Sequence, residues 1–306
     1  MSATELLGRP SKGYMRTLVG LLMAASAWAQ VASVVVTAEG HHRKDAPEIL
    51  KDDVAVHLGK DQVGVAEWLP ERGALQLLLM IDDGSDTELG LQLEDLRKFM
   101  RAQPASTEIG VDYMRNGTTI PVHALTSDHD AAAKSLRLPI GTAGGAASPY
   151  VALSERIKKW APFAGRREVL MISSGIDALY YGGDLQNPYL MRAIRDAQKA
   201  GILVHSIYYG SAGHSGHSYY QMNFGQSYLS RLGDETGGEA YWQGFQNPVA
   251  FAPYLDDLTK RLQNQYRLTL SGANDSKGEL QELRVRTEKA GAELSAASRV
   301  WVGSGN

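Results

Sequence analysis

The sequence predicts an α/β protein: a doubly wound, mostly parallel sheet with one antiparallel edge strand, plus a small β domain built from both chain ends. Residues 75–81 (LQLLLMI) are nearly all apolar, which is typical of a strand buried on both faces by helices. Between residues 73 and 264, helical patterns alternate with short apolar runs, as expected of a parallel sheet covered on both sides. Both chain ends consist instead of short strand-like segments separated by turn residues.

The two ends of the mature chain resemble each other in pattern. Residues 31–37 are rich in β-branched side chains, and residues 54–58 alternate before a turn at residues 59–62. Near the C-terminus, Gly, Asn, Asp and Ser turns separate three alternating segments at residues 266–270, 283–287 and 298–302. Neither end holds enough strand to be stable alone, so we expect residues 30–72 and residues 265–303 to combine into one β domain.

The central unit, residues 73–264, is predicted to be a doubly wound α/β domain. It opens with the buried strand and a helix. This helix is indicated by apolar side chains at helical spacing, namely Leu89, Leu93, Leu96 and Met100. Two strand-like segments, residues 109–114 and 119–125, then flank Asn116-Gly117, a strong hairpin signal. Pro121 lacks a backbone N–H, which restricts the second strand to an edge of the sheet.

The remainder of the central unit alternates helices and strands. Apolar side chains recur at helical spacing in three segments, at residues 150–160, 190–197 and 251–262. Strands are predicted at residues 168–173 and 202–208. Gly201 is suited to end the helix before the second of these strands, because glycine readily adopts the left-handed conformation of a helix C-terminus.

The composition excludes several classes of function. The chain has 306 residues, 43% of them hydrophobic, and a formal net charge of −3. Nearly balanced charge argues against a dedicated nucleic-acid binder, which gathers a basic excess on one face. The absence of cysteine excludes disulfides, zinc–thiolate sites, iron–sulfur clusters and thiol catalysis.

Residues 1–29 are predicted to be a signal peptide. Arg16 precedes a short apolar stretch, and Ala27 and Ala29 provide the small residues that signal peptidase recognises. Cleavage is expected after Ala29, with either Met1 or Met15 as the true start. The apolar stretch is shorter than the roughly 20 residues that span a bilayer. We therefore expect an exported protein, periplasmic or secreted, without a transmembrane segment in the mature chain.

Three loops are expected to carry the function. In open α/β sheets, ligands bind beyond the carboxyl ends of the strands, where the strand order reverses. The loops predicted at this edge are residues 82–86 (DDGSD), 144–148 (GGAAS) and 173–177 (SSGID).

Taken together, these loops resemble those of the von Willebrand factor A domain, and specifically the A-domain-related, acidobacterial-type family of exported bacterial proteins. The resemblance spans nearly the whole mature chain. It includes four further features: residues 50–54 (LKDDV), residues 125–130 (LTSDHD), Thr236-Gly237-Gly238 and the C-terminal strands. It implies adhesion or assembly, with a protein or a cell-surface polymer as the partner.

Most A domains have a metal-ion-dependent adhesion site, built from Asp-x-Ser-x-Ser, a Thr and an Asp on the three loops. Such oxygen ligands suit a hard cation such as Mg²⁺. This chain departs from the consensus, because the matching positions hold Asp82, Gly84, Asp86, Ala146 and Ser174. The nearest substitutes along the chain are Ser85, Ser148 and Asp177. The resemblance therefore implies a degenerate site with no consensus metal and no other cofactor, and binding of Mg²⁺, Mn²⁺ or Ca²⁺ is kept as the weaker alternative.

The acidic loop also has an ordinary structural interpretation. Asp and Gly after a strand commonly form a turn, which is the role favoured for Asp83 and Ser85. Asp86 or Thr87 is suited to cap the following helix, since a side-chain oxygen there accepts a free backbone N–H.

Other candidate sites are weaker. His214 and His217 have a spacing seen in metal sites, but no acidic residue or third ligand lies in that Gly/Ser/Tyr-rich stretch, which favours a surface loop. The aromatic side chains that follow form a candidate interaction loop: Tyr219, Tyr220, Phe224 and Tyr228. Their alternative role is to cover the end of the sheet. His205, inside a strand, is interpreted as a core histidine with satisfied hydrogen bonds.

The sequence contains no Gly-x-Ser-x-Gly, no Gly-x-Gly-x-x-Gly after the first central strand and no phosphate-binding loop motif, so we predict no enzyme and no catalytic residues. The first hypothesis is an exported protein-interaction or adhesion module that does not use the consensus metal. The alternatives are a metal-dependent module acting through Asp82, Asp86 and Asp177, and an exported hydrolase with an unrecognised site.

Overall fold

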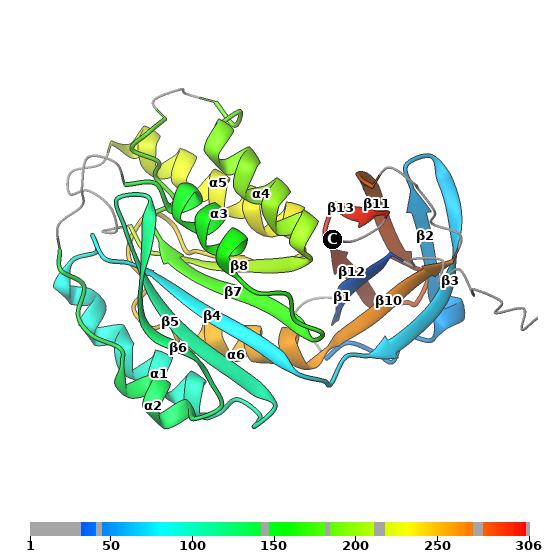
Figure 1. Cartoon of the computed structure of the whole chain (residues 1–306), viewed down its shortest axis with the longest axis horizontal. Coiled ribbons are helices and arrows are strands. Elements are labelled where there is room, and N and C mark those ends of the chain that lie inside the picture. The colour runs from blue at the N-terminus through cyan, green and yellow to red at the C-terminus, as the bar shows by residue number, and fades with distance from the viewer. Residues whose placement is uncertain are drawn as a thin grey trace, which may run out of the picture.

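The computed structural model describes residues 32–40, 45–141, 147–180, 184–210, 218–271 and 278–303. It contains a six-stranded sheet between two layers of helices and a separate seven-stranded sheet that curls beside it (Figure 1). The predicted fold class is confirmed: a mostly parallel sheet with an antiparallel edge strand, accompanied by an antiparallel sheet. The predicted signal peptide and His214 and His217 lie outside the described residues.

The six-stranded sheet has the order β6-β5-β4-β7-β8-β9. Its strands are β4 (Leu75–Asp82), β5 (Thr107–Arg115), β6 (Thr118–Thr126), β7 (Arg166–Ser173), β8 (Ile202–Tyr208) and β9 (Ala240–Tyr241). All neighbours pair in parallel except β5 and β6. The central strand β4 has helices on both sides, which explains why it is apolar at nearly every position.

The β5–β6 hairpin confirms the turn prediction. Asn116 and Gly117 both have positive φ, 51° and 70°, as the tight two-residue hairpin turn requires. Strand β6 is the outer strand of the sheet, so Pro121 costs no ladder hydrogen bond to a further strand.

Helices cover both faces of this sheet. Figure 1 shows α1 (Leu93–Arg101), α2 (His129–Lys134) and α6 (Ala252–Gln263) on one face, with α3 (Pro149–Lys159), α4 (Pro188–Ala200) and α5 (Tyr219–Thr236) on the other. Successive side chains of β4 alternate between two cores: Leu77 and Leu79 pack with α1 and α6, whereas Leu78 and Met80 pack with α3 and α4. Each buried leucine contributes about 1.5–3 kcal/mol, so the two cores position the loops firmly.

The first helix of the central unit differs from the sequence prediction at its first turn. The segment through Leu89 is a 3-10 helix, η3 (Thr87–Gln92), and the α-helix begins only at Leu93. Gly90 packs so closely on Leu138 that an added Cβ would lie 2.6 Å from its Cδ2. Helix α4 ends as predicted at Gly201, whose φ is 64°.

The curled sheet joins the two ends of the chain in the order β12-β1-β10-β3-β2-β11-β13. Its strands are β1 (Ser33–Gly40), β2 (Val54–Leu58), β3 (Asp61–Pro70), β10 (Gln265–Ser271), β11 (Glu279–Thr287), β12 (Ala292–Ala296) and β13 (Arg299–Val302), and a short 3-10 turn, η2 (Lys51–Asp53), precedes β2. Trp68 stacks on Tyr266 at 4.5 Å and donates to the Ile49 carbonyl. The strand at 292–296 was not predicted, because its residues (AELSA) lack β propensity and depend on pairing with β1.

An ionic cluster fastens the curled sheet to the α/β unit. Arg261 on α6 binds Glu39 on β1 at 2.7 Å, Glu239 at 2.6 Å and Asp257 at 3.0 Å. The guanidinium satisfies carboxylates from both units because its donors are arranged in a rigid fork. In Figure 1 the curled sheet lies beside the amino ends of the parallel strands, away from their carboxyl ends.

No helix within the described ranges is long and apolar enough to cross a membrane.

Candidate functional site at the carboxyl edge of the sheet

The strand order reverses at β4. The chain passes from β4 to β5 on one side and later places β7 on the other side, so the crevice lies beyond Asp82 and Ser173. Two of the three predicted loops do meet there: the Ser173 hydroxyl lies 3.5 Å from the Asp82 carboxylate. The second predicted loop is only partly described, and Ala146 lies outside the described residues.

Asp82 is a recessed carboxylate at the centre of this edge. Its side chain is 8% exposed and accepts a 2.9 Å hydrogen bond from the Gly84 backbone N–H. Burial raises the pKa of Asp82 to about 6; the Gly84 bond opposes this rise, the charge of Asp83 adds to it, and the Ser173 hydroxyl opposes it. Carboxylates whose pKa is raised by burial cluster at functional sites.

Asp83 has a role that the sequence interpretation missed. The residue lies in the predicted turn, but its fully buried carboxylate forms a two-point ion pair with Arg137, at 2.7 and 3.0 Å. The Arg137 guanidinium also lies over the Tyr113 ring, 3.9 Å from its centre. The Asp83 carbonyl accepts from the backbone of Ile140 and Gly141, so this residue holds the segment after α2 against the end of β4. No local pattern links residues 83 and 137.

Asp86 and Ser85 follow their structural interpretations in part. Asp86 caps η3 by accepting from the Glu88 N–H at 3.1 Å, as predicted, and it also accepts from the Tyr209 hydroxyl at 3.0 Å. Burial, aided by Asp86, raises the pKa of Tyr209, so the phenol stays a donor. The Ser85 hydroxyl is buried and finds no hydrogen-bond partner within the described part of the chain.

The third loop and the start of α3 form a second cluster. Asp177 accepts from the Leu179 N–H at 2.9 Å and from the Asn187 amide at 3.0 Å, and Asn187 in turn caps α4. Burial raises the pKa of Asp177, and its hydrogen bonds with Asn187, Leu179 and Ser148 oppose the rise. Ser148 caps α3 and Ser174 accepts from the Ile176 N–H, so each of these side chains serves a turn or a helix end.

The alternative metal set is not assembled by the residues that the structure describes. Among them, no group of three or more His, Asp or Glu side chains is placed to hold a metal ion. Asp86 and Asp177 are engaged with Tyr209 and Asn187, while Gly84 offers no side-chain oxygen. These residues do not fit a consensus adhesion-site cation.

The aromatic segment is a helix rather than the predicted loop, and its role in interaction stays a prediction. Tyr219, Tyr220, Phe224 and Tyr228 all lie on α5, which starts with a capping box formed by Ser218 and Gln221. That Ser-x-x-Gln pattern was the missed sequence signal. Gly225 lets the helix touch the third loop, because an added Cβ would lie 2.2 Å from the Ser174 carbonyl oxygen.

The four aromatic side chains divide between two roles, with the partly buried Phe224 packing beside Tyr228 against the core. Tyr228 is buried against Tyr150 and donates to the Asp184 carbonyl, so it covers the sheet as the alternative interpretation proposed. Tyr219 and Tyr220 are 68% and 60% exposed at the beginning of the helix, beside the carboxyl edge.

Exposed apolar side chains surround this edge, a feature that the sequence did not reveal. We call them the apolar rim: Leu91, Leu138, Ile140, Leu179, Leu185, Tyr219, Tyr220 and Val249. They come from loops, from η3 and from the start of α5. Three contacts join some of these segments: Gln92 donates to the Val249 carbonyl, the Ile140 N–H donates to Asp83, and Tyr219 contacts Phe245. Leu91 and Val249 are the most exposed of them, at 79% and 98%. Such a gathering of apolar surface is typical of a binding face.

His205 confirms its interpretation as a core residue. It is fully buried on β8, its Nε2 lies 2.9 Å from Glu168, and its Nδ1 accepts from the Glu239 backbone N–H. Because Nδ1 accepts, the proton is on Nε2 and points at the carboxylate.

Comparison with known proteins gives a likeness of fold. No protein-family model matches the chain, and no curated protein matches it. Its structure is similar to conserved hypothetical protein BatB from Bacteroides thetaiotaomicron (12% identity, 62% of this chain and 98% of that one, TM-score 0.43). It is also similar to a von Willebrand factor type A structure from Catenulispora acidiphila (11% identity, 82% of this chain and 73% of that one, TM-score 0.45). A third similar structure is the vWF domain of the type V pili tip protein Mfa5 from Porphyromonas gingivalis (11% identity, 65% of this chain and 95% of that one, TM-score 0.41).

Proposed function

We propose that this chain is an exported protein-interaction module of the von Willebrand factor A-related, acidobacterial-type family, with a degenerate metal-ion-dependent adhesion site. Its partner is a protein that docks on the carboxyl edge of the parallel sheet. The observation that carries the proposal is the apolar rim, which surrounds the recessed Asp82 at the point where α/β folds bind ligands.

The loops at this edge support docking without a cation. The Asp83–Arg137 pair, the Asp86–Tyr209 bond and the Asp177–Asn187 bond hold three loops in position with groups from the chain itself. A rigid edge reduces the ordering cost of association, which favours binding of a folded partner. The partner surface is apolar at its centre, to cover Leu91 and Val249, and polar around it.

Two double variants that introduce negative charge, one on the apolar rim and one away from it, test the docking face. The test variant is Leu91→Glu with Val249→Glu, and the matched control is Leu50→Glu with Leu69→Glu, which changes two side chains that are 57% and 53% exposed outside the α/β unit. The wild-type chain, immobilised, is exposed to an envelope extract of the producing organism, and bound proteins are quantified by mass spectrometry.

The proposal expects one or a few proteins to be enriched by the wild type and the control, and to be lost from the rim variant. Binding that is equal for all three chains, or no enrichment over the bare matrix, would overturn it. Turnover of ester, phosphate or glycoside substrates by the purified chain would instead support the hydrolase alternative.

Export is part of the proposal and rests on the N-terminal pattern. Expression with an intact export pathway should yield a mature chain that begins at Gln30, as measured by intact mass and N-terminal sequencing. Recovery of the uncleaved chain from the cytoplasm would contradict this part.

A further inference from the structure

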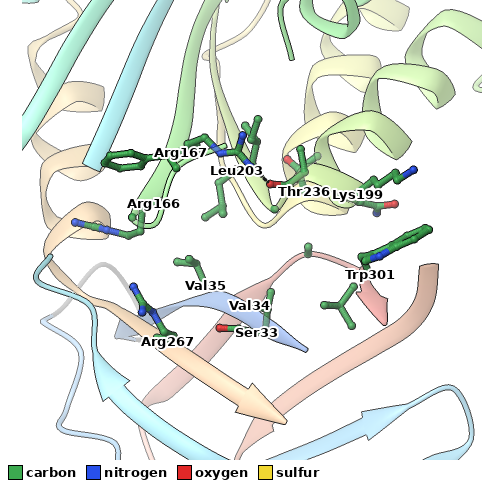
Figure 2. A pocket seen from close by; sticks show the side chains of 18 of the residues that line it. Ser33, Val34, Val35, Arg166, Arg167, Lys199, Leu203, Thr236, Arg267 and Trp301 are labelled. Atoms are coloured by element: carbon green, nitrogen blue, oxygen red, sulfur yellow. Dashed lines mark hydrogen bonds between the residues drawn. The ribbon is translucent and has the colours of Figure 1, made fainter. Parts of the chain in front are cut away.

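A basic cleft of about 420 Å³ lies between the two units, at the opposite end of the parallel strands from the apolar rim. One wall consists of the beginnings of β7 and β8 and the end of α4, and the other consists of β1, β10 and β13 (Figure 2). Its volume lies within the range of small-molecule sites, which is roughly 300–1,000 Å³. None of the proposed docking chemistry uses this cleft.

Cationic side chains outnumber carboxylates on its walls. The cations that line it are Arg166, Arg167, Lys199, Arg267 and Arg299, whereas Glu71 is the one lining carboxylate among the described residues. Glu71 is committed to Arg267, at 2.5 Å. Within the described ranges, Arg167, Lys199 and Arg299 have no carboxylate at ion-pair distance. The chain as a whole is slightly acidic, so this local excess of positive charge is not a reflection of composition.

Arg166 shows that the cleft is built rather than incidental. Its side chain is only 7% exposed and is anchored by donation to the Leu262 carbonyl and the Gln265 side chain. Its Nε nevertheless has no hydrogen-bond partner within the described part of the structure. Burial lowers the pKa of Arg166, and the nearby cations Arg72 and Arg267 lower it further, although Glu168 and Glu71 oppose the change. A buried guanidinium with incomplete pairing is costly, and an anion in the cleft would offset part of that cost through its charge.

Cations line both walls of the cleft. Figure 2 shows Arg166 on the α/β side and Arg267 on the curled-sheet side, with Lys199 and Trp301 facing each other further along. The Lys199 ammonium lies 4.6 Å from the centre of the Trp301 ring. Apolar side chains, including Val34, Val35 and Leu203, complete the lining. An anion placed between the walls would therefore contact cations of both units, with an apolar surface beside it.

We propose that this cleft binds a small polyvalent oxyanion, carrying phosphate or carboxylate groups, between Arg166, Arg167 and Lys199 on one wall and Arg267 and Arg299 on the other. Guanidinium groups recognise both kinds of anion through paired N–H donors. The anion removes the mutual repulsion of the two walls and thereby strengthens the contact between the α/β unit and the curled sheet.

Calorimetry and thermal melting of the full chain test this site with inorganic pyrophosphate and citrate as probes, against sodium chloride at matched ionic strength. The test variant, Lys199→Ala with Arg299→Ala, removes two exposed cations of the lining. Because Lys199 also lies over the Trp301 ring, the effect of each probe is measured against the melting temperature of the same variant without probe. The control, Lys134→Ala with Arg286→Ala, removes one exposed lysine and one exposed arginine away from the cleft. Both variants change the net charge equally, so nonspecific electrostatics affects them alike.

The proposal expects at least one probe to bind the wild type and the control and to raise their melting temperatures, with affinity at least fivefold weaker in the test variant. Binding of pyrophosphate alone identifies a phosphate ligand, and binding of citrate alone identifies a carboxylate ligand. Equal binding by the test variant and the control, or no effect beyond that of sodium chloride, overturns the site. Circular dichroism of the test variant checks that it is folded before its binding is compared with that of the control.

Discussion

The clearest quantitative prediction concerns the recessed carboxylate of Asp82. Burial raises its pKa from 3.8 to about 6 in the folded chain, so folding favours the protonated form. Its contribution to stability is fully present below the unfolded value and is lost as the pH rises through about 6. A shift of this size corresponds to about 3 kcal/mol, since each pKa unit represents about 1.4 kcal/mol.

The variant Asp82→Asn removes the titration while retaining an oxygen that accepts from the Gly84 N–H. The free energy of unfolding of the variant relative to the wild type should therefore rise by about 2.4 kcal/mol between pH 4 and pH 8, since the rest of the roughly 3 kcal/mol is lost below pH 4. Taking this difference cancels the effects of other carboxyl groups whose pKa burial raises, such as Asp112 and Asp177. Urea unfolding followed by tryptophan fluorescence measures the free energy at each pH.

The matched control is Asp45→Asn, because the Asp45 side chain is 95% exposed. This control reports whether an exchange of Asp for Asn by itself changes the pH dependence of the free energy of unfolding. A difference curve for Asp82→Asn that is flat, or that falls with rising pH, would refute the reasoning. A falling curve would mean that the charged form is stabilised in the folded chain, as it would be beside a bound cation.

Three further predictions concern the same edge. Arg137→Ala leaves the buried Asp83 carboxylate without its partner and should lower the free energy of unfolding by about 3 kcal/mol. This value is near the lower end for broken buried pairs because Arg137 is 35% exposed. A loss below about 1 kcal/mol in urea unfolding would contradict the prediction. Gly225→Ala should lower the free energy of unfolding by about 1–3 kcal/mol, because the added Cβ overpacks against the third loop. The loss should exceed that of Gly233→Ala on the same helix, whose added Cβ would lie 3.3 Å from its nearest neighbour. Equal losses would count against the close contact. Excess Mg²⁺, Mn²⁺ or Ca²⁺ should not raise the melting temperature above that in EDTA, whereas a cation at 100 times its dissociation constant would add about 2.7 kcal/mol.

Local patterns in the sequence were sufficient for most of the α/β unit. The apolar run at residues 75–81 predicted the central strand, and Asn116-Gly117 with Pro121 predicted an edge hairpin, because these effects depend on neighbouring residues alone. The helix α5 was missed although Ser218 and Gln221 signalled its start, since the surrounding glycines and serines suggested a loop. Strand β12 could not be predicted, because its strand conformation depends on pairing with β1, far away in the chain.

For the candidate site, the sequence by itself determined that the first and third loops meet, because the strand order on which this depends follows from local periodicity. The departures from a metal-site consensus were implied by the resemblance of these loops to the A domain. The tertiary structure decided the rest: the Asp83–Arg137 pair, the apolar rim and the basic cleft. The residues of each set are far apart in the chain, and the energies that matter there are burial and Coulomb terms, which depend on distances in space. A carboxylate such as Asp82 therefore acquires its raised pKa only when folding removes its water and places no cation beside it.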